Sequence, residues 1–237
     1  MEDTETLLYI YGFGLLFFIV ALVFFIINIK ELIRLKRTKY TKVVALKKGF
    51  CKIKGKVVKV APLLKSPLSQ VDCVYFGFNV KEVVRKASTD SYSWESFLSH
   101  SQTVVFGVAD DSGIAHIAVN STIMDLHDDV RVKSNVLNKP TEEMVNALKH
   151  YDKEEKLLSR LRYSEDYLEV GDEVHVLGEV IDFDGGVPIF GIGKEPCLIS
   201  DKSADEITGG YLKWIIWSFM AMVAIAWGLV KFTVANQ

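Results

Sequence analysis

The sequence lacks the short motifs by which common enzyme classes are recognised. It contains no G-x-S-x-G elbow, no H-E-x-x-H pair, no P-loop and no G-x-G-x-x-G that opens a helix after a strand. The motif scan therefore offers no enzyme class, no catalytic residue and no cofactor. Acidic and basic residues nearly balance, with a formal net charge of −2, so composition gives no general bias toward nucleic acid.

Cysteine is scarce and dispersed. Cys51, Cys73 and Cys197 lie far apart in the sequence, and no pair has the C-x-x-C spacing of a zinc or redox site. Because free cysteine behaves as a small apolar side chain, buried or partly buried thiols are expected. The acidic stretch 125–129 is the densest polar group, but closely spaced carboxylates alone do not make a metal site. No metal site is predicted.

Two long apolar runs are the strongest signal in the chain. The first extends from Leu7 to Ile27 without a charge, and the second extends from Trp214 to Val230. At about 1.5 Å per residue, each run is long enough to cross a hydrocarbon core of roughly 30 Å. We predict transmembrane helices at 7–29 and 211–232. A cleaved signal peptide is the alternative for the first run, and the acidic N-terminus disfavours it.

Basic residues follow the first run and none precedes it. Because Lys and Arg resist translocation, we predict a two-pass protein of a prokaryotic cell membrane with the middle domain in the cytoplasm. An organelle outer membrane is the alternative, and its insertion machinery could reverse the orientation. The basic segment 30–48 is either a plain topology signal or a lipid-binding collar at about 1 kcal/mol per basic residue. The candidate lipid ligands are Arg34, Lys36, Arg37 and Lys39.

Residues 49–207 predict a soluble domain that is mainly β. Strand periodicity begins at Cys51, where apolar residues alternate with Lys52, Lys54 and Lys56, and Asp72 to Val84 indicates a more buried strand. Two hairpins are predicted, one across 110–113 and one across 184–186, with glycine supplying a positive φ in each turn. One amphipathic helix is predicted at about 141–160. The expected soluble fold is an OB-like barrel or an α+β fold between two membrane helices.

The second membrane helix carries a face of small residues. Ala221, Ala224 and Gly228 lie on nearly one side of it. Small residues let helices approach closely, so this face is predicted to pack on the first helix or on another protomer. The second possibility would make the protein a homo-oligomer.

The order of these segments resembles the GIDE-type family, whose domain is also described as beside-a-membrane. The matching residues are Gly55-Lys56-Val57, Pro67-Leu68, Cys73-Val74-Tyr75, Trp94, Phe106-x-Val108-x-Asp110-x-x-Gly113 and Tyr167-Leu168-x-x-Gly171-Asp172-Glu173-Val174-x-Val176-x-Gly178-Glu179. The similarity covers roughly residues 5–232. It implies a membrane-embedded protein related to the E3 ubiquitin ligases of mitochondrial and chloroplast outer membranes, with bacterial and archaeal relatives. The candidate structural or binding positions within these motifs are Cys73, Tyr75, Trp94, Asp110, Gly113, Gly171, Asp172 and Gly178.

The ligases of this family end in a zinc-binding RING finger that recruits the ubiquitin-charged conjugating enzyme. The present sequence stops at Gln237, and three dispersed cysteines cannot build such a finger. We therefore expect a non-catalytic binding or sensor module that recruits an unidentified protein partner at the membrane. The alternatives are a component of an E3 ligase or other enzyme completed by a partner, and a protein that binds anionic membrane lipid. Nucleic acid is not an expected partner, because no basic groove with stacking aromatics is evident.

Overall fold

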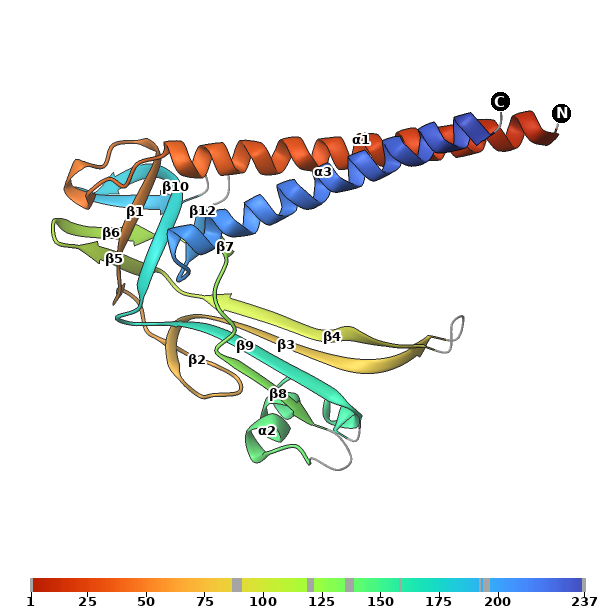
Figure 1. The fold of residues 1–237 in the computed structure, drawn as a ribbon. Coiled ribbons are helices and arrows are strands. Elements are labelled where there is room, and N and C mark those ends of the chain that lie inside the picture. Colours follow the sequence, from red (N-terminus) through yellow and green to blue (C-terminus); the bar gives the residue numbers. More distant parts are fainter. Residues whose placement is uncertain are drawn as a thin grey trace. The chain divides into compact units, whose positions relative to one another are not determined.

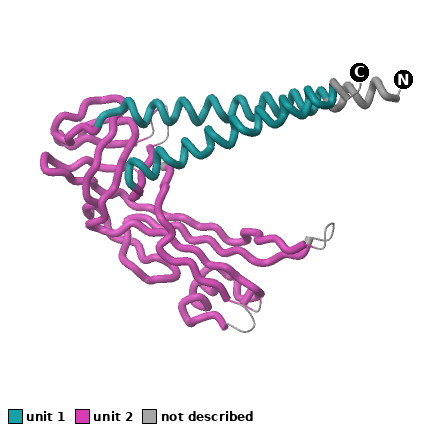
Figure 2. The backbone as a smooth tube through the Cα atoms, in the orientation of Figure 1, with its two compact units in different colours: residues 1–39, 203–237 teal, residues 40–202 magenta. Residues whose placement is uncertain are grey.

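The computed structural model describes residues 2–86, 91–118, 122–134, 139–157, 159–191, 193 and 197–235. It divides into two compact units, one of residues 1–39 and 203–237 and one of residues 40–202 (Figure 2). In chain order (Figure 1) the elements are α1 (Glu2–Arg37), η1 (Val43–Ala45), β1 (Gly49–Lys59), β2 (Leu64–Lys65), β3 (Asp72–Lys86), β4 (Ser91–Thr103), β5 (Phe106–Asp110), β6 (Gly113–Ile117), β7 (Thr122–Met124), β8 (Val130–Ser134), α2 (Glu142–His150), η2 (Glu154–Lys156), β9 (Leu161–Glu169), β10 (Glu173–Asp184), β11 (Val187–Gly191), β12 (Cys197–Ser200) and α3 (Ala204–Ala235).

The first unit is an antiparallel pair of long helices. The apolar segments of α1 and α3 have mean hydropathies of 2.7 and 1.9, and both are long and apolar enough to cross a membrane. The antiparallel sense is set by ring contacts at both ends, with Tyr11 near Phe232 and Phe24 near Trp214. A hydrogen bond of 2.7 Å joins the Tyr11 hydroxyl to Thr233 Oγ1. The predicted fold class, two apolar helices flanking a mainly β domain, is confirmed.

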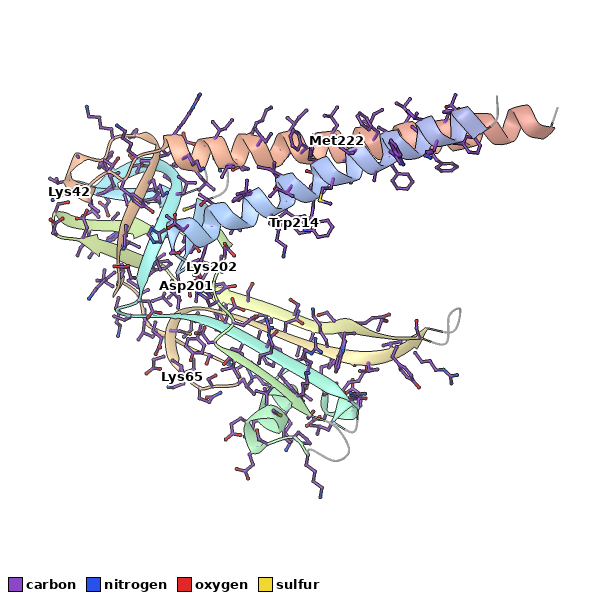
Figure 3. All side chains as sticks on the ribbon, in the orientation of Figure 1. Lys42, Lys65, Asp201, Lys202, Trp214 and Met222 are labelled. Carbon is purple, nitrogen blue, oxygen red and sulfur yellow. The ribbon has the colours of Figure 1, made fainter. Side chains whose placement is uncertain are left out.

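The two helices meet along a coiled-coil-like seam. The less exposed positions of each helix recur at alternating intervals of three and four residues, which is the spacing of a left-handed helix pair. Polar side chains in the seam are satisfied locally, since Asn28 Nδ2 donates to the Phe24 carbonyl at 2.7 Å. The seam positions are Gly14, Phe18, Ala21, Phe25, Asn28, Leu32 and Leu35 on α1, and Tyr211, Ile215, Ser218, Met222, Ile225 and Leu229 on α3 (Met222 is labelled in Figure 3).

The small-residue face of α3 lies off this seam. Ala221, Ala224 and Gly228 are all exposed, and no heavy atom lies within 4 Å of the position that a Cβ of Gly228 would take. The residue that approaches α1 closely is instead Leu229, whose Cδ2 lies 2.8 Å from the Cβ position of Gly14. Packing of Ala224 and Gly228 on another protomer therefore stays a prediction.

The second unit contains a closed five-stranded barrel. Strand β1 pairs with both β5 and β10, so the sheet closes in the order β1-β5-β6-β11-β10 and back to β1. The β6–β11 pair is parallel, and the other four pairs of the barrel are antiparallel. This is the five-stranded arrangement of OB-type barrels, and β12 and β7 extend the sheet beyond β10.

The barrel interior is apolar and closely packed. Ile53 on β1, Phe106 on β5, Ile117 on β6 and Val176 on β10 are fully buried in one cluster. The alternation predicted along β1 is confirmed at Ile53 and Val57. It is wrong at Lys52, which is only 6 % exposed because its ammonium lies over the Tyr40 ring, 4.3 Å from the centroid.

A second sheet is built from the two long insertions into the barrel sequence. β2, β3 and β4 lie between β1 and β5, and β8, α2 and β9 lie between β6 and β10. These strands pair in the order β2-β3-β9-β8, and β4 pairs with the same strand, β3 (Figure 1). Neither insertion makes this sheet alone, since the central pair joins β3 of the first insertion to β9 of the second.

Helix α2 is shorter than predicted. The sequence predicts a helix over about 141–160, whereas α2 ends at His150 and β9 begins at Leu161. Asp152 adopts a positive φ of 53°, which ends the helix, and Lys153 N donates back to the Leu148 carbonyl at 2.9 Å.

The two hairpin turns of the barrel work differently. Gly185 and Gly186 have φ of 56° and 90°, as the sequence predicts for the turn between β10 and β11. Gly113 does not adopt a positive φ. The β5–β6 turn is instead held by Asp110, whose carboxylate accepts hydrogen bonds from Ser112 N at 2.7 Å and Gly113 N at 3.1 Å.

Both ends of the second unit meet the barrel at the same strand. The Tyr40 hydroxyl lies 2.8 Å from His175 Nδ1 on β10. His175 also pairs with Ser200, near the end of β12. The segment from the first helix and the segment to the second helix therefore leave from neighbouring positions on the barrel.

Candidate binding site

A pocket of about 370 Å³ lies on the second sheet, beside α2. Its volume falls within the range of about 300–1,000 Å³ that is usual for ligand sites. Side chains from three sources line it, namely the β2–β3 segment, the strands β3 and β4, and the C-terminal half of α2. These residues are Leu64, Lys65, Pro67, Gln70, Phe76, His100, Gln102, Asn146, Ala147, His150 and Tyr151 (Lys65 is labelled in Figure 3).

One wall of the pocket is a turn fixed by a buried carboxylate. Glu165 on β9 is fully buried, and it accepts hydrogen bonds from Leu68 N at 2.7 Å and Ser69 N at 2.9 Å, and also from the Ser69 hydroxyl. These donors compensate for the burial of the carboxylate. Gln70 takes a positive φ of 56°, and its Nε2 donates to the Ser66 and Pro67 carbonyls. The turn is therefore held in one conformation from two sides.

The opposite wall is α2, which begins with a capped turn and buries its apolar side. Thr141 Oγ1 accepts from Met144 N at 3.5 Å, and Glu142 and Glu143 occupy the first turn, where negative charge is favourable. Met144, Ala147 and Leu148 are buried against the sheet. This packing leaves the neighbouring positions Asn146 and His150 at the pocket.

A series of rings forms the interior of the pocket. His100 on β4 lies 5.8 Å from the Phe76 ring and 5.3 Å from the Tyr151 ring. Tyr151 also meets the edge of His150 at 4.9 Å and stacks on Phe78 at 5.8 Å. Burial raises the pKa of the Tyr151 hydroxyl, and nearby Glu165 adds to this effect. The hydroxyl therefore stays protonated at neutral pH, as a hydrogen-bond donor.

The polar groups of the pocket suit recognition rather than chemistry. Lys65, two imidazoles and three side-chain amides line it, and no carboxylate or thiol does. Lys65 is 2.8 Å from Asp72, so its charge is partly balanced. A nucleophile paired with a base is missing from the lining residues, whereas flat rings and amides can hold a peptide group or a planar ligand.

None of the candidate motif residues of the sequence lines this pocket, and their contacts stabilise the fold. Burial raises the pKa of Cys73 to about 12, and Cys73 is packed beside Leu68 under α2. Tyr75 bonds to Asp166, and burial raises the pKa of both groups. Trp94 receives the Arg162 guanidinium over its ring at 4.3 Å.

The remaining motif residues organise turns and strand packing in the barrel. Burial alone would raise the pKa of Asp110, but hydrogen bonds from Ser112, Val43 N and Gly113 N outweigh it and lower that pKa. Gly171 has a φ of 104° and donates to the Val57 carbonyl, and Asp172 accepts from Glu169 N at 2.8 Å. At Gly178, a Cβ would lie 2.7 Å from Cys197 Sγ, so only glycine fits.

The other predicted positions are placed as follows. Arg34, Lys36 and Arg37 end α1, Lys39 follows it, and Arg34 pairs with Glu31 at 3.0 Å. The carboxylates of the acidic stretch 125–129 have different partners. Asp125 pairs with Lys202, and Asp129 accepts a hydrogen bond from Tyr167 N at 2.9 Å. Within the described ranges, no group of three His, Cys, Asp or Glu side chains could hold a metal ion.

Sequence reasoning missed Glu165, His100 and His150. Glu165 follows Leu161 and Tyr163 at two-residue spacing, so strand alternation was the signal for its burial. No motif marks His100 or His150, which come to line one pocket only when β4 and α2 are brought together. The site is a product of the tertiary fold.

The chain matches a known family. The model of the GIDE family, described as E3 ubiquitin ligase, matches residues 80–232. That range includes β4, α2 and β9, and it reaches into α3. Comparisons with curated proteins and with solved structures give no match.

Proposed function

Since the chain belongs to the GIDE family, we propose that it is a membrane-anchored recruitment module related to E3 ubiquitin ligases, and that it binds a protein partner beside the membrane. The observation that carries this proposal is the pocket beside α2. Its walls are fixed before any partner arrives, one by the Glu165 carboxylate and one by the buried side of α2. A preformed site loses little conformational entropy on binding.

The chemistry of the lining favours a peptide segment of the partner. The rings of Phe76, His100 and Tyr151 offer apolar area, and Gln102 and Asn146 offer both hydrogen-bond donors and acceptors. These groups match the alternation of apolar side chains and amides in a polypeptide. The module is non-catalytic, and it acts by holding the partner at the membrane.

Site-specific photo-crosslinking in cells tests this proposal. A photoreactive amino acid replaces Asn146, which lines the pocket, and in a control chain it replaces Glu142, which lies one turn earlier on α2 and outside the pocket. We expect a discrete protein adduct from position 146 and none from position 142. His100→Ala should remove the adduct while the chain stays folded. Equal adducts from both positions, or an adduct that survives His100→Ala, would refute recruitment through the pocket.

The family description favours one second candidate, a component of an E3 ubiquitin ligase. Identifying the adduct by mass spectrometry distinguishes this candidate from recruitment of another protein partner. A ubiquitin-conjugating or ubiquitin-like protein attached at position 146 supports the ligase component. A partner without that chemistry supports simple recruitment.

A further inference from the structure

The second sheet presents a basic face opposite α2. Along β9, Leu161, Tyr163 and Glu165 are buried on the α2 side, and Arg162 and Ser164 alternate with them on the other side. The same alternation on β8 buries Ser134 and leaves Arg131 and Lys133 exposed. Residues that pair directly across antiparallel strands share one face, so the register identifies the members of this face.

Three cations lie side by side across this face. Lys133 on β8 pairs with Arg162 on β9, and Arg162 pairs with Lys81 on β3. Like charges directly opposite each other destabilise a sheet. Throughout the described part of the chain, Lys81 and Arg162 make no ion pair that would relieve this repulsion. An anionic partner that covers the row would relieve it.

Aromatic and further basic side chains extend the row along the β3–β4 hairpin. Trp94 lies beside Val83 in the register, and its ring also faces Arg160 at 6.0 Å. Tyr92 pairs with Arg85 and is 71 % exposed. The face therefore combines cations with amphipathic aromatic rings.

Acidic side chains near these strands are already engaged. Glu82 lies on the α2 side, where Lys156 Nζ donates to it at 2.8 Å. Asp128 pairs with Arg131 at the edge of the face, and Asp166 bonds to Tyr75. None of these carboxylates compensates the charge of Lys81 or Arg162.

We propose that this face, formed by Lys81, Arg162, Lys133 and Trp94, binds the anionic headgroups of the lipid bilayer in which the chain is anchored. Lys and Arg near an anionic surface contribute about 1 kcal/mol each, and Trp and Tyr favour the membrane–water interface. Single-stranded nucleic acid is a poorer match, because it needs several free aromatic faces, whereas the Trp94 ring is already covered by Arg162 and leaves Tyr92 as the exposed ring of this face. The chain has two helices that are long and apolar enough to anchor it in such a bilayer.

The test measures lysine reactivity in the full chain. The protein is reconstituted in nanodiscs of phosphatidylcholine alone, or of phosphatidylcholine with phosphatidylglycerol. It is then methylated reductively with formaldehyde, an uncharged reagent, and each lysine is followed by mass spectrometry. We expect Lys81 and Lys133 to react about fivefold more slowly in the anionic discs, the ratio that about 1 kcal/mol supports. Lys149 on α2, exposed beyond the other side of the sheet, is the internal control and should react equally in both.

Two further measurements keep the proposal open to refutation. Lys81→Glu places a carboxylate opposite Arg162, so the variant should fold at least as stably as the parent and should lose the protection of Lys133 in anionic discs. Protection that persists in this variant, or equal rates in the two kinds of disc, overturns the proposal. A single-stranded oligonucleotide added to neutral discs should give no protection. Protection by the oligonucleotide as strong as that by anionic lipid would assign the face to nucleic acid instead.

Discussion

Leu68 and Glu165 are 97 residues apart in the chain and are joined by a buried hydrogen bond of 2.7 Å from the Leu68 backbone N–H to the Glu165 carboxylate. This bond links the first insertion to the second, because Leu68 precedes β3 and Glu165 lies in the middle of β9. The pocket beside α2 depends on it, since the turn that carries Pro67 and Gln70 is held from this side.

Glu165→Gln should therefore destabilise the second unit and loosen the pocket. The new amide presents N–H groups toward the donors of Leu68 and Ser69, which leaves at least one buried donor unsatisfied at a cost of about 2 kcal/mol. For a unit of this size we expect an unfolding temperature lower by roughly 4–8 °C. Thermal unfolding of the full chain in detergent measures it. Glu155→Gln, at an exposed position on η2, is the matched control and should change nothing.

The three thiols should be inert in the folded protein. Cys51, Cys73 and Cys197 are free and buried. Burial raises the pKa of Cys51 to about 11 and that of Cys197 to about 12, so at about pH 8 roughly one Cys51 thiol in a thousand is a thiolate. Iodoacetamide should label the chain only after denaturation. Rapid labelling of any one of the three under native conditions would contradict the burial described for it.

Asp110 should make the barrel sensitive to acid. Its folded pKa is lowered, so its contribution to stability is complete above the ordinary carboxyl value of about 4 and is lost as pH falls through the folded pKa. At neutral pH, Asp110→Asn should lower the free energy of unfolding by about 1 kcal/mol. This value is at the low end for hydrogen bonds to a charged group, because the Asp110 carboxylate is partly solvated. Unfolding curves of parent and variant, recorded from neutral pH to below about pH 3, should converge at the acid end. A constant difference at every pH would mean that the carboxylate charge plays no part.

The seam of the helix pair gives a matched pair of substitutions. Gly14→Ile should separate α1 from α3, because a Cβ there meets Leu229 at 2.8 Å, whereas Gly228→Ile points into open space. The readout is oxidative cross-linking between Tyr11→Cys and Thr233→Cys, whose parent side chains are 2.7 Å apart. We expect several-fold less cross-link with Gly14→Ile and an unchanged yield with Gly228→Ile. The reverse result would place Ala224 and Gly228 on the seam instead.

Patterns confined to neighbouring residues were sufficient for the two long helices and for the strands of the barrel hairpins. The apolar runs mark α1 and α3 by length alone, and Ile53 and Val57 mark β1 by alternation. Of the second sheet, only the strand over Asp72 to Val84 was predicted, because the other strands carry polar residues on the exposed face. β4 is rich in serine, and the alternation in β9 is disguised by a buried glutamate, Glu165.

Features that depend on distant partners could not be read from the sequence. Ala224 and Gly228 have the spacing of a packing face, but which face of a helix packs is decided by the partner helix. Strand alternation predicts Lys52 on the solvent side of β1. It is buried instead, because its ammonium lies over the Tyr40 ring. The pocket needs His100 from β4 and Tyr151 at the end of α2 together, and β5, β6, β7 and β8 lie between these two positions in the chain.

The interleaving of the two sheets constrains how a newly made chain can fold. The barrel cannot close until β10 emerges from the ribosome to pair with β1, and the second sheet cannot form its central pair until β9 emerges to join β3. Long-range strand pairing of this kind is slow and leaves apolar strands exposed while it waits. The β3–β4 and β5–β6 hairpins can form earlier, but β1 keeps one edge unpaired until β10 is made and β3 keeps one edge unpaired until β9 is made. This topology therefore leaves the free edges of β1 and β3 open to mispairing until most of the middle domain has been synthesised.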